Sequence, residues 1–382
     1  VDMSYSGIGS CILGYTDPDV DAAVHVAVNV GSMSTLNCAE EVDLADLLCE
    51  LHPWAEMVRY ARCGGEAMAV AVRIARAHAR RDKIAFCGYH GWHDWYLAAN
   101  LGSNNALGDH LLPGLAPNGV PRQLAGTAFP FHYNCIDELK SIVQAHGSEL
   151  AAIVMEPVRN QLPQDGFLQE VREIANRNGS MLIFDEVTSA WRLNSGGAHL
   201  LYGVSPDIAV FAKAISNGYP MAAIIGTGTV MQAAQESFIS STYWTERIGP
   251  AAALATIRKH RVCDVPARLL STGKKIQAAW KKAAEQTGLA LSVSGIPPLA
   301  HFSLHTDNAQ AARTLFTQLM LERGFLASNA FYATYAQSDE DIERYSAALT
   351  ESFRELAQAI ETGTVTKLLK GPVAHVGFSR LT

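Results

Sequence analysis

The chain has 382 residues, of which 48% are hydrophobic, enough for one large domain with a smaller one attached. The formal net charge is −7, no basic block is present and no apolar run reaches the length of a membrane span, so we expect neither a nucleic-acid nor a membrane partner. Seven cysteines without a CxxC pair favour free thiols in a reducing compartment, so we expect a cytoplasmic protein, and we expect a natural segment to precede Val1.

The first 51 residues predict an extended opening followed by two helices. Residues 5–14 are strand-like and punctuated by glycine. They contain a GxG pattern but lack the third glycine of a dinucleotide-binding motif, so no Rossmann site is predicted. Asp17 and Pro18 predict the start of a helix that ends near Val30, and residues 40–51 predict a second, amphipathic helix.

Two adjacent glycines lie between the next strand and helix. A strand is predicted over 57–61 and a long helix over 68–80, with Cys63, Gly64 and Gly65 between them. Glycines at this place leave backbone amide groups free at the positive end of a helix, which is an anion site in some proteins. The same pattern is also typical of an ordinary tight turn between strand and helix, which is the more common case.

Aromatic and histidine side chains follow the strand predicted over 83–86. Tyr89 stands at the strand end beside glycine, where it can stack on a planar ligand. His90 and His93 are three positions apart, but no third ligand follows at a convincing spacing, so no metal site is predicted. Residues 98–130 are rich in Gly, Asn and Pro and predict a long loop over the site.

Polar groups end several apolar strands in the middle of the chain. A strand at 151–155 is followed by Glu156 and, in the loop, by Asn160. After a helix at 166–178, the strand at 181–184 ends at Asp185, and the strand at 208–212 ends at Lys213. Another apolar strand follows at 221–226. This alternation from about 57 to 226 predicts a mostly parallel sheet covered by helices on both faces.

An acid and a lysine at the carboxyl edge of such a sheet suit pyridoxal phosphate (PLP), because ligands bind at that edge. Asp185 would keep the ring nitrogen protonated, so that the ring can take up electrons. Lys213 would form a Schiff base, and a desolvated lysine is the better nucleophile. Taken singly, each residue is more often a helix cap or a surface side chain, so the prediction depends on the other motifs.

The character of the sequence changes near residue 261. Residues 240–250 are polar and aromatic and precede a helix that is predicted to begin at Ala251. Helices at 265–287, 308–323 and 338–360 and strands near 290–293 and 300–304 predict a compact α+β unit. We therefore expect a large domain over 25–260 and a small C-terminal domain over 261–382, joined by the N-terminal segment 1–24.

Five motifs together resemble the class III aminotransferases of the fold type I PLP enzymes. They are Cys-Gly-Gly-Glu-Ala at 63–67, Gly-Tyr-His-Gly at 88–91, Glu-Pro at 156–157, Asp-Glu-Val at 185–187 and the strand that ends at Lys213. The resemblance covers nearly the whole chain and is closest to the branch that contains glutamate-1-semialdehyde aminomutase. It implies an α/β fold with a mostly parallel central sheet between helices, in three layers, and a smaller α+β domain.

The resemblance also implies roles for particular residues. Lys213 and Asp185 would be catalytic. The cofactor-binding set would be Gly64 and Gly65 at the phosphate, Tyr89 and Val187 on the two ring faces, Glu156 and Asn160 near the phenolic oxygen, His90, Asp185, Lys213, and Thr245 at the phosphate of a neighbouring subunit. Thr242 is a less favoured alternative to Thr245. A homodimer with shared active sites is expected, and the low charged fraction of 18% fits a surface partly used in subunit contacts.

The expected reaction is transfer of an amino group from a small-molecule donor, an amine or ω-amino acid, to a carbonyl acceptor by a ping-pong mechanism through Lys213. The alternatives are an intramolecular aminomutase of the glutamate-1-semialdehyde type and, less favoured, a PLP-binding subunit without turnover.

Three departures from the family stand out. Cys63 and Gly65 replace Ser or Thr near the phosphate, residues 8–10 lack the aminomutase tryptophan, and Tyr332 replaces an acidic residue.

Overall fold

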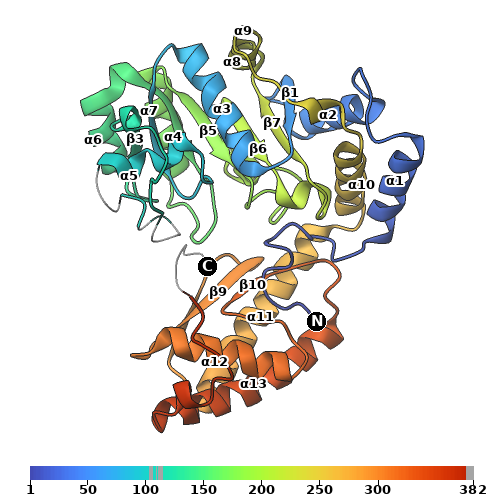
Figure 1. Ribbon diagram of the computed structural model, residues 1–382, viewed down its shortest axis with the longest axis vertical. Helices are drawn as coiled ribbons and strands as arrows, with labels where there is room; N and C mark the ends of the chain where they lie inside the picture. The colour runs from blue at the N-terminus through green and yellow to red at the C-terminus, as the bar shows by residue number, and fades with distance from the viewer. Residues whose placement is uncertain (103–105, 109, 111–114, 376–382) are drawn as a thin grey trace.

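The computed structural model describes residues 1–102, 106–108, 110 and 115–375, whose strands form two sheets (Figure 1). The larger sheet has seven strands in the order β1-β7-β6-β5-β4-β2-β3. These strands are β1 (Met57–Ala61), β2 (Lys83–Cys87), β3 (Ala128–Pro130), β4 (Leu150–Met155), β5 (Met181–Asp185), β6 (Ile208–Phe211) and β7 (Ala222–Gly226). Neighbouring strands from β3 to β6 are parallel, and β7 is antiparallel to both β6 and β1. The predicted α/β fold with a mostly parallel sheet is therefore confirmed.

Alternating side chains of the strands bury the two faces of this sheet against different helices. In β6, Ile208 and Val210 belong to the core that contains α3 (Gly64–Ala79), whereas Ala209 and Phe211 belong to the core that contains α10 (Ile248–Val262). Farther along the sheet, α7 (Phe167–Asn178) covers the same face as α10 (Figure 1). Because strand side chains have a period of two, both faces are apolar and the sheet lies between two helical layers, as predicted.

The C-terminal part is built on the smaller, antiparallel sheet. Its strands β8 (Leu291–Ser294), β9 (Leu299–Leu304) and β10 (Ala330–Tyr332) pack against α11 (Val265–Thr287), α12 (Ala309–Glu322) and α13 (Asp339–Glu361). The N-terminal residues lie against this part through hydrogen bonds from the Met3 amide to the Leu326 carbonyl and from the Tyr332 amide to the Ser4 carbonyl (Figure 1). One apolar core extends from the large sheet into the C-terminal part. The domain boundaries at 24/25 and 260/261 stay predictions.

The prediction of a strand-like segment over 5–14 is wrong, because this segment forms consecutive tight turns. Ser6, Gly7, Ile8 and Gly9 all have positive φ angles, from +46° to +81°, which an extended strand does not allow. The Gly9 amide accordingly bonds the carbonyl of Tyr5 in the same segment. By contrast, α1 (Pro18–Val30) and α2 (Ala39–Leu51) begin and end within one residue of the prediction. The Asp17 carboxylate caps α1 as its position before Pro18 predicts.

Two other segments differ from the prediction. Helix α3 begins at Gly64, four residues earlier than expected, so the two glycines form its first turn. The loop expected over 98–130 contains α5 (Ala99–Gly102) and β3, and its positions 103–105, 109 and 111–114 lie outside the described residues. The remaining helices are α4 (Asp94–Leu97), α6 (Ile136–His146), α8 (Gly228–Met231) and α9 (Ala233–Glu236). Among the helices described, none has the length and apolar character needed to cross a membrane.

Candidate active site

A cavity of about 430 Å³ opens at the carboxyl edge of the parallel strands. Seven of the ten predicted site residues line it: Gly64, Gly65, Tyr89, His90, Asp185, Val187 and Lys213. They come from the first turn of α3 and from the segments that follow β2, β5 and β6. Parallel strands bring their carboxyl ends to one edge, and for this reason side chains far apart in the sequence meet there.

Asp185 is buried and held by two hydrogen bonds. Its Oδ1 accepts a bond from the Val187 amide at 3.0 Å, and its Oδ2 lies 2.8 Å from Nδ1 of His90. The other ring nitrogen of His90 lies 3.1 Å from the carbonyl of Cys87, which can only accept, so this nitrogen carries a proton. A second proton must lie between His90 and Asp185. The two residues therefore form a buried, hydrogen-bonded pair that fixes Asp185 at the cavity wall.

Lys213 lies two positions after the last residue of β6, at the start of a 3-10 turn, and has a strained backbone. Its φ angle of +50° lies in the left-handed region, which non-glycine residues rarely adopt outside functional sites and turns. Its Nζ donates a hydrogen bond of 2.9 Å to Oγ1 of Thr188. Burial, reinforced by the positive charges of Arg159 and Arg192, lowers the pKa of Lys213 to about 8 against the opposing effect of nearby carboxylates. A lysine with this pKa is partly neutral near physiological pH, and the neutral amine is the nucleophile.

The first turn of α3 fits a phosphate group. The helix has 16 residues, and the amide groups of its first turn have no partner within the helix. A Cβ at Gly64 would come within 2.9 Å of a Val187 methyl carbon, and one at Gly65 would come within 3.1 Å of Nδ1 of His93. That His93 nitrogen and Nε of Arg62, which also borders the cavity, are buried and have no hydrogen-bond partner among the residues that the structure describes. Such orphaned polar atoms beside free amides suit an anionic ligand.

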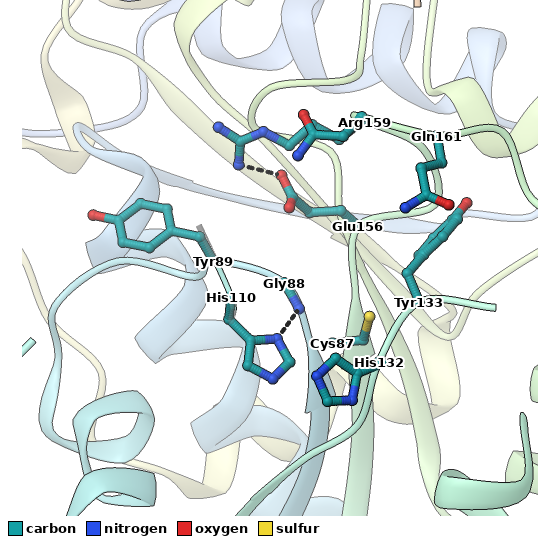
Figure 2. A pocket seen from close by; sticks show the side chains of 10 residues that line it. Cys87, Gly88, Tyr89, His110, His132, Tyr133, Glu156, Arg159 and Gln161 are labelled. Atoms are coloured by element: carbon teal, nitrogen blue, oxygen red, sulfur yellow. Dashed lines mark hydrogen bonds and ion pairs between the residues drawn. The ribbon is translucent and has the colours of Figure 1, made fainter. Parts of the chain in front are cut away.

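A second cavity of about 210 Å³ adjoins the first and shares Tyr89 with it. Two further predicted residues, Glu156 and Asn160, line this second cavity. Glu156 is labelled in Figure 2. Figure 2 shows Arg159 turned toward Glu156, with Nη1 of Arg159 2.9 Å from Oε1 of Glu156. Burial raises the pKa of the Glu156 carboxyl, and Asp185 adds to this effect, although Arg159 opposes it. This ion pair and the neighbouring amide side chains give the second cavity polar groups beside its aromatic lining.

Thr245, the tenth predicted residue, lines neither cavity. It ends a 3-10 turn over Thr242–Thr245, and its hydroxyl donates to the carbonyl of Ser34 at 2.5 Å. The structure contains one chain and does not test whether Thr245 reaches the phosphate of a neighbouring subunit. This role of Thr245 stays a prediction.

The opening segment around residues 8–10 and Tyr332, the two places where the sequence is expected to depart from the aminomutases, lie next to each other. A Cβ at Gly9, in the opening segment, would come within 3.0 Å of the Tyr332 ring and within 2.8 Å of Nη2 of Arg192. The ring of Tyr5 packs edge-on against Tyr332, with ring centroids 5.4 Å apart. The opening segment and the end of β10 therefore form one patch, which contains both regions where the sequence is expected to depart from the aminomutases.

The sequence did not single out three residues that act on Lys213: Thr188, Arg159 and Arg192. Thr188 directly follows the Asp-Glu-Val motif, and Arg159 lies three positions after Glu156 in the same loop, so proximity in the sequence was an available signal. Arg192 is 1% exposed, and its burial lowers its pKa to about 10. In the described part of the chain, no three His, Cys, Asp or Glu side chains gather as a metal site requires.

Comparison with known proteins decides the family, because residues 1–335 match the family described as aminotransferase class-III. The chain belongs to the class III aminotransferases. It is 33% identical over 368 residues to a 3-aminobutyryl-CoA aminotransferase of Cloacimonas acidaminovorans (strain Evry), covering 92% of this chain and 84% of the relative. It is 34% identical over 379 residues to a glutamate-1-semialdehyde 2,1-aminomutase of Roseiflexus castenholzii (strain DSM 13941 / HLO8), covering 93% and 86%.

The fold agrees with this membership. The FumI protein of Sphingopyxis sp. MTA144, solved with PLP, superposes with a TM-score of 0.84 at 21% identity, covering 95% of this chain and 86% of that chain. This class III aminotransferase is a PLP-dependent enzyme of fold type I, as predicted, and it acts on small amino and carbonyl compounds.

Proposed function

We propose that this class III aminotransferase works by a ping-pong mechanism with Lys213 as the residue that binds PLP covalently. The observation that carries the proposal is the convergence of Lys213, the Asp185–His90 pair and the free amides of α3 on one cavity. The donor that we propose is an amine or an ω-amino acid. The name of the relative 3-aminobutyryl-CoA aminotransferase describes an amino group that is not on the carbon next to the carbonyl, which supports a donor of this kind.

Different residues around the cavity would bind different parts of the cofactor. In this proposal, the Asp185 carboxylate bonds the ring nitrogen, and His90 keeps the carboxylate charged and oriented. Tyr89 and Val187 cover the two ring faces, and the amides of α3 bind the phosphate. When bound, PLP supplies an aldehyde that accepts the amino group and a ring that takes up electrons. Glu156 and Asn160 would face the phenolic oxygen from the second cavity.

Lys213 has a second task after its nitrogen is free of the cofactor. Its Nζ, partly neutral because burial lowers its pKa to about 8, takes the proton from the donor carbon and returns it later in the reaction. An amine with a pKa near the working pH is suited to both directions of proton transfer. Asp185 does not move a proton in this scheme, since its role is to hold charge at the ring nitrogen.

Reduction with borohydride followed by peptide mapping tests the covalent role. The pyridoxyl group is expected on Lys213, and a label on any other lysine would refute the assignment. With amino donor alone, the bound cofactor should convert stoichiometrically to pyridoxamine phosphate and return only when a different carbonyl compound is added. Turnover of glutamate-1-semialdehyde to 5-aminolevulinate without a second substrate would instead support the aminomutase alternative.

We also propose a cytoplasmic homodimer in which Thr245 reaches the phosphate of the other subunit. The large apolar side chains Met33 and Tyr243, which are 43% and 57% exposed, lie beside the Ser34–Thr245 contact and support a partner surface there. All seven cysteines are free thiols, which supports a reducing compartment. Sedimentation that shows an active monomer would rule out the shared site, and cell fractionation tests the location.

A further inference from the structure

The side chain nearest to the lysine amine is a buried threonine. Thr188 is 3% exposed, lines the same cavity as Lys213, and its Oγ1 accepts the 2.9 Å hydrogen bond from Nζ. Within the described ranges of the chain, no other hydrogen bond to this Nζ is present. The hydroxyl is therefore the polar group that determines where the end of the long lysine side chain lies.

The turn that carries Thr188 is itself fixed on both sides. The Val187 amide bonds the Asp185 carboxylate at 3.0 Å, and the carbonyl of Thr188 accepts a bond from Nε of the buried Arg192 at 3.3 Å. The Ala190 amide closes the turn by bonding the carbonyl of Glu186 at 3.1 Å. Because the backbone on either side is held in this way, the hydroxyl is a stationary partner, whereas the lysine has four rotatable side-chain bonds.

A hydroxyl suits an amine that must change its protonation state. It accepts a hydrogen bond from the ammonium form, and it can donate one to the lone pair of the neutral amine. A carboxylate in the same place would favour only the ammonium form, and a methyl group would hold neither form. A threonine can therefore keep the nitrogen in one place while the nitrogen gains and loses a proton.

We propose that Thr188 is a positioning residue that holds Nζ of Lys213 whenever this nitrogen is not bonded to the cofactor, so that proton transfer starts from one fixed place. The inference rests on the proposed role of Lys213. A merely structural threonine would affect folding or cofactor affinity, whereas a positioning threonine affects the proton-transfer step after the cofactor and donor are bound.

Three variants separate these possibilities. Thr188→Val keeps the shape and removes the hydroxyl, and Thr188→Ser restores the hydroxyl. Thr272→Val is the matched control, because Thr272 is fully buried in α11 and, within the described part of the chain, its Oγ1 has no hydrogen-bond partner. Should Thr188→Val fail to fold, Thr188→Ala with the same measurements replaces it.

The first measurement is a single turnover with a donor that carries deuterium at the carbon that loses its proton. Thr188→Val should slow this half-reaction by about ten- to a hundred-fold, as expected when a hydrogen bond to a charged group is lost, and should enlarge the isotope effect. Thr188→Ser should recover most of the rate, and Thr272→Val should match the parent enzyme. PLP affinity, measured by titration of the apoprotein, should change less than about three-fold, because Thr188 acts on lysine geometry rather than on cofactor binding.

The second measurement needs no cofactor. The apoprotein is reductively methylated with formaldehyde and borohydride at several pH values, and the yield at Lys213 is compared with the other lysines of the same digest. The pH midpoint at Lys213 should move downward in Thr188→Val and not in Thr188→Ser, because the ammonium form loses its acceptor. An unchanged rate, isotope effect and midpoint in Thr188→Val would overturn the inference. So would an equal loss in Thr188→Ser or Thr272→Val. If borohydride places the pyridoxyl label on another lysine, the proposed function itself fails first.

Discussion

Substitution of Asp185 by Asn should leave the fold almost intact and remove most of the activity. The structure explains why both effects are expected together. An amide oxygen at position 185 can still accept the bond from the Val187 amide. The amide nitrogen would then donate to Nδ1 of His90, in the tautomer whose other nitrogen donates to the Cys87 carbonyl. The hydrogen bonds are therefore kept while the carboxylate is replaced by a neutral group.

The size of the activity loss follows from the charge that disappears. In the proposed site, a neutral amide would not hold the ring nitrogen of the cofactor in its protonated form, and the charge-assisted bond that we propose to that nitrogen would be lost. Removing one preorganised electrostatic group from an active site typically costs about 10²- to 10³-fold in rate, or roughly 3–4 kcal/mol of barrier. Since Asp185 is buried, solvent does not compensate for this loss, and we expect at least this range.

The assay is the donor half-reaction followed by the absorbance of the bound cofactor, together with thermal unfolding of the apoprotein. Asp207→Asn is a matched control, because Asp207 pairs with Arg172 at 2.8 Å and bonds the Leu182 amide at 2.7 Å without lining the cavity. The control should keep the half-reaction rate. A folded Asp185→Asn protein with a rate near that of the parent would refute the role of Asp185 at the ring nitrogen.

Three further predictions concern other parts of the site. In the apoprotein, the rate of covalent capture of PLP by Lys213 should rise with pH to a midpoint near 8, because burial lowers its pKa and only the neutral amine reacts; a midpoint near the usual 10.5 would contradict this. Gly64→Ala places a methyl group 2.9 Å from Val187 and should weaken PLP affinity by about ten-fold or more in an absorbance titration. Gly371→Ala, whose methyl group would have no atom of the described residues within 4 Å, should not. Glu186→Gln should lower the free energy of unfolding in urea by about 3 kcal/mol, because the fully buried Glu186 carboxylate accepts four hydrogen bonds; a loss below ~1 kcal/mol would contradict its structural role.

The large sheet could be predicted well because its strands are short, apolar and bounded by turns. The run at 181–184 and the one at 208–212 differ from β5 and β6 by one residue at the C-terminal end. Helix starts were predictable where a cap is local, as at Asp17, whose carboxylate accepts bonds from the Asp19 and Val20 amides. The segment 5–14 failed because hydrophobicity does not reveal that four successive residues have positive φ angles.

The site could be predicted only as far as topology determines it. Asp185 ends β5 and Lys213 follows β6, and adjacent parallel strands end at the same edge, so their meeting required no knowledge of side-chain conformation. Arg192 lies in the same segment as Asp185, yet its burial depends on a turn in which Trp191 has a φ angle of +68°. The contact of Gly9 with Tyr332 joins two ends of the chain, and no local pattern indicates such a pairing.

The charged side chains around Lys213 should shift the pH dependence of PLP capture in opposite directions. Burial is the largest influence on the lysine, Arg159 is the next and also lowers its pKa, and Glu156 acts in the opposite direction. Replacing Arg159 by Gln should therefore raise the pH midpoint of PLP capture, and replacing Glu156 by Gln should lower it. Because these two side chains form an ion pair of 2.9 Å, the two changes should largely cancel in the double variant. Midpoints that move in the same direction in both single variants would show that packing, rather than charge, determines the reactivity of Lys213.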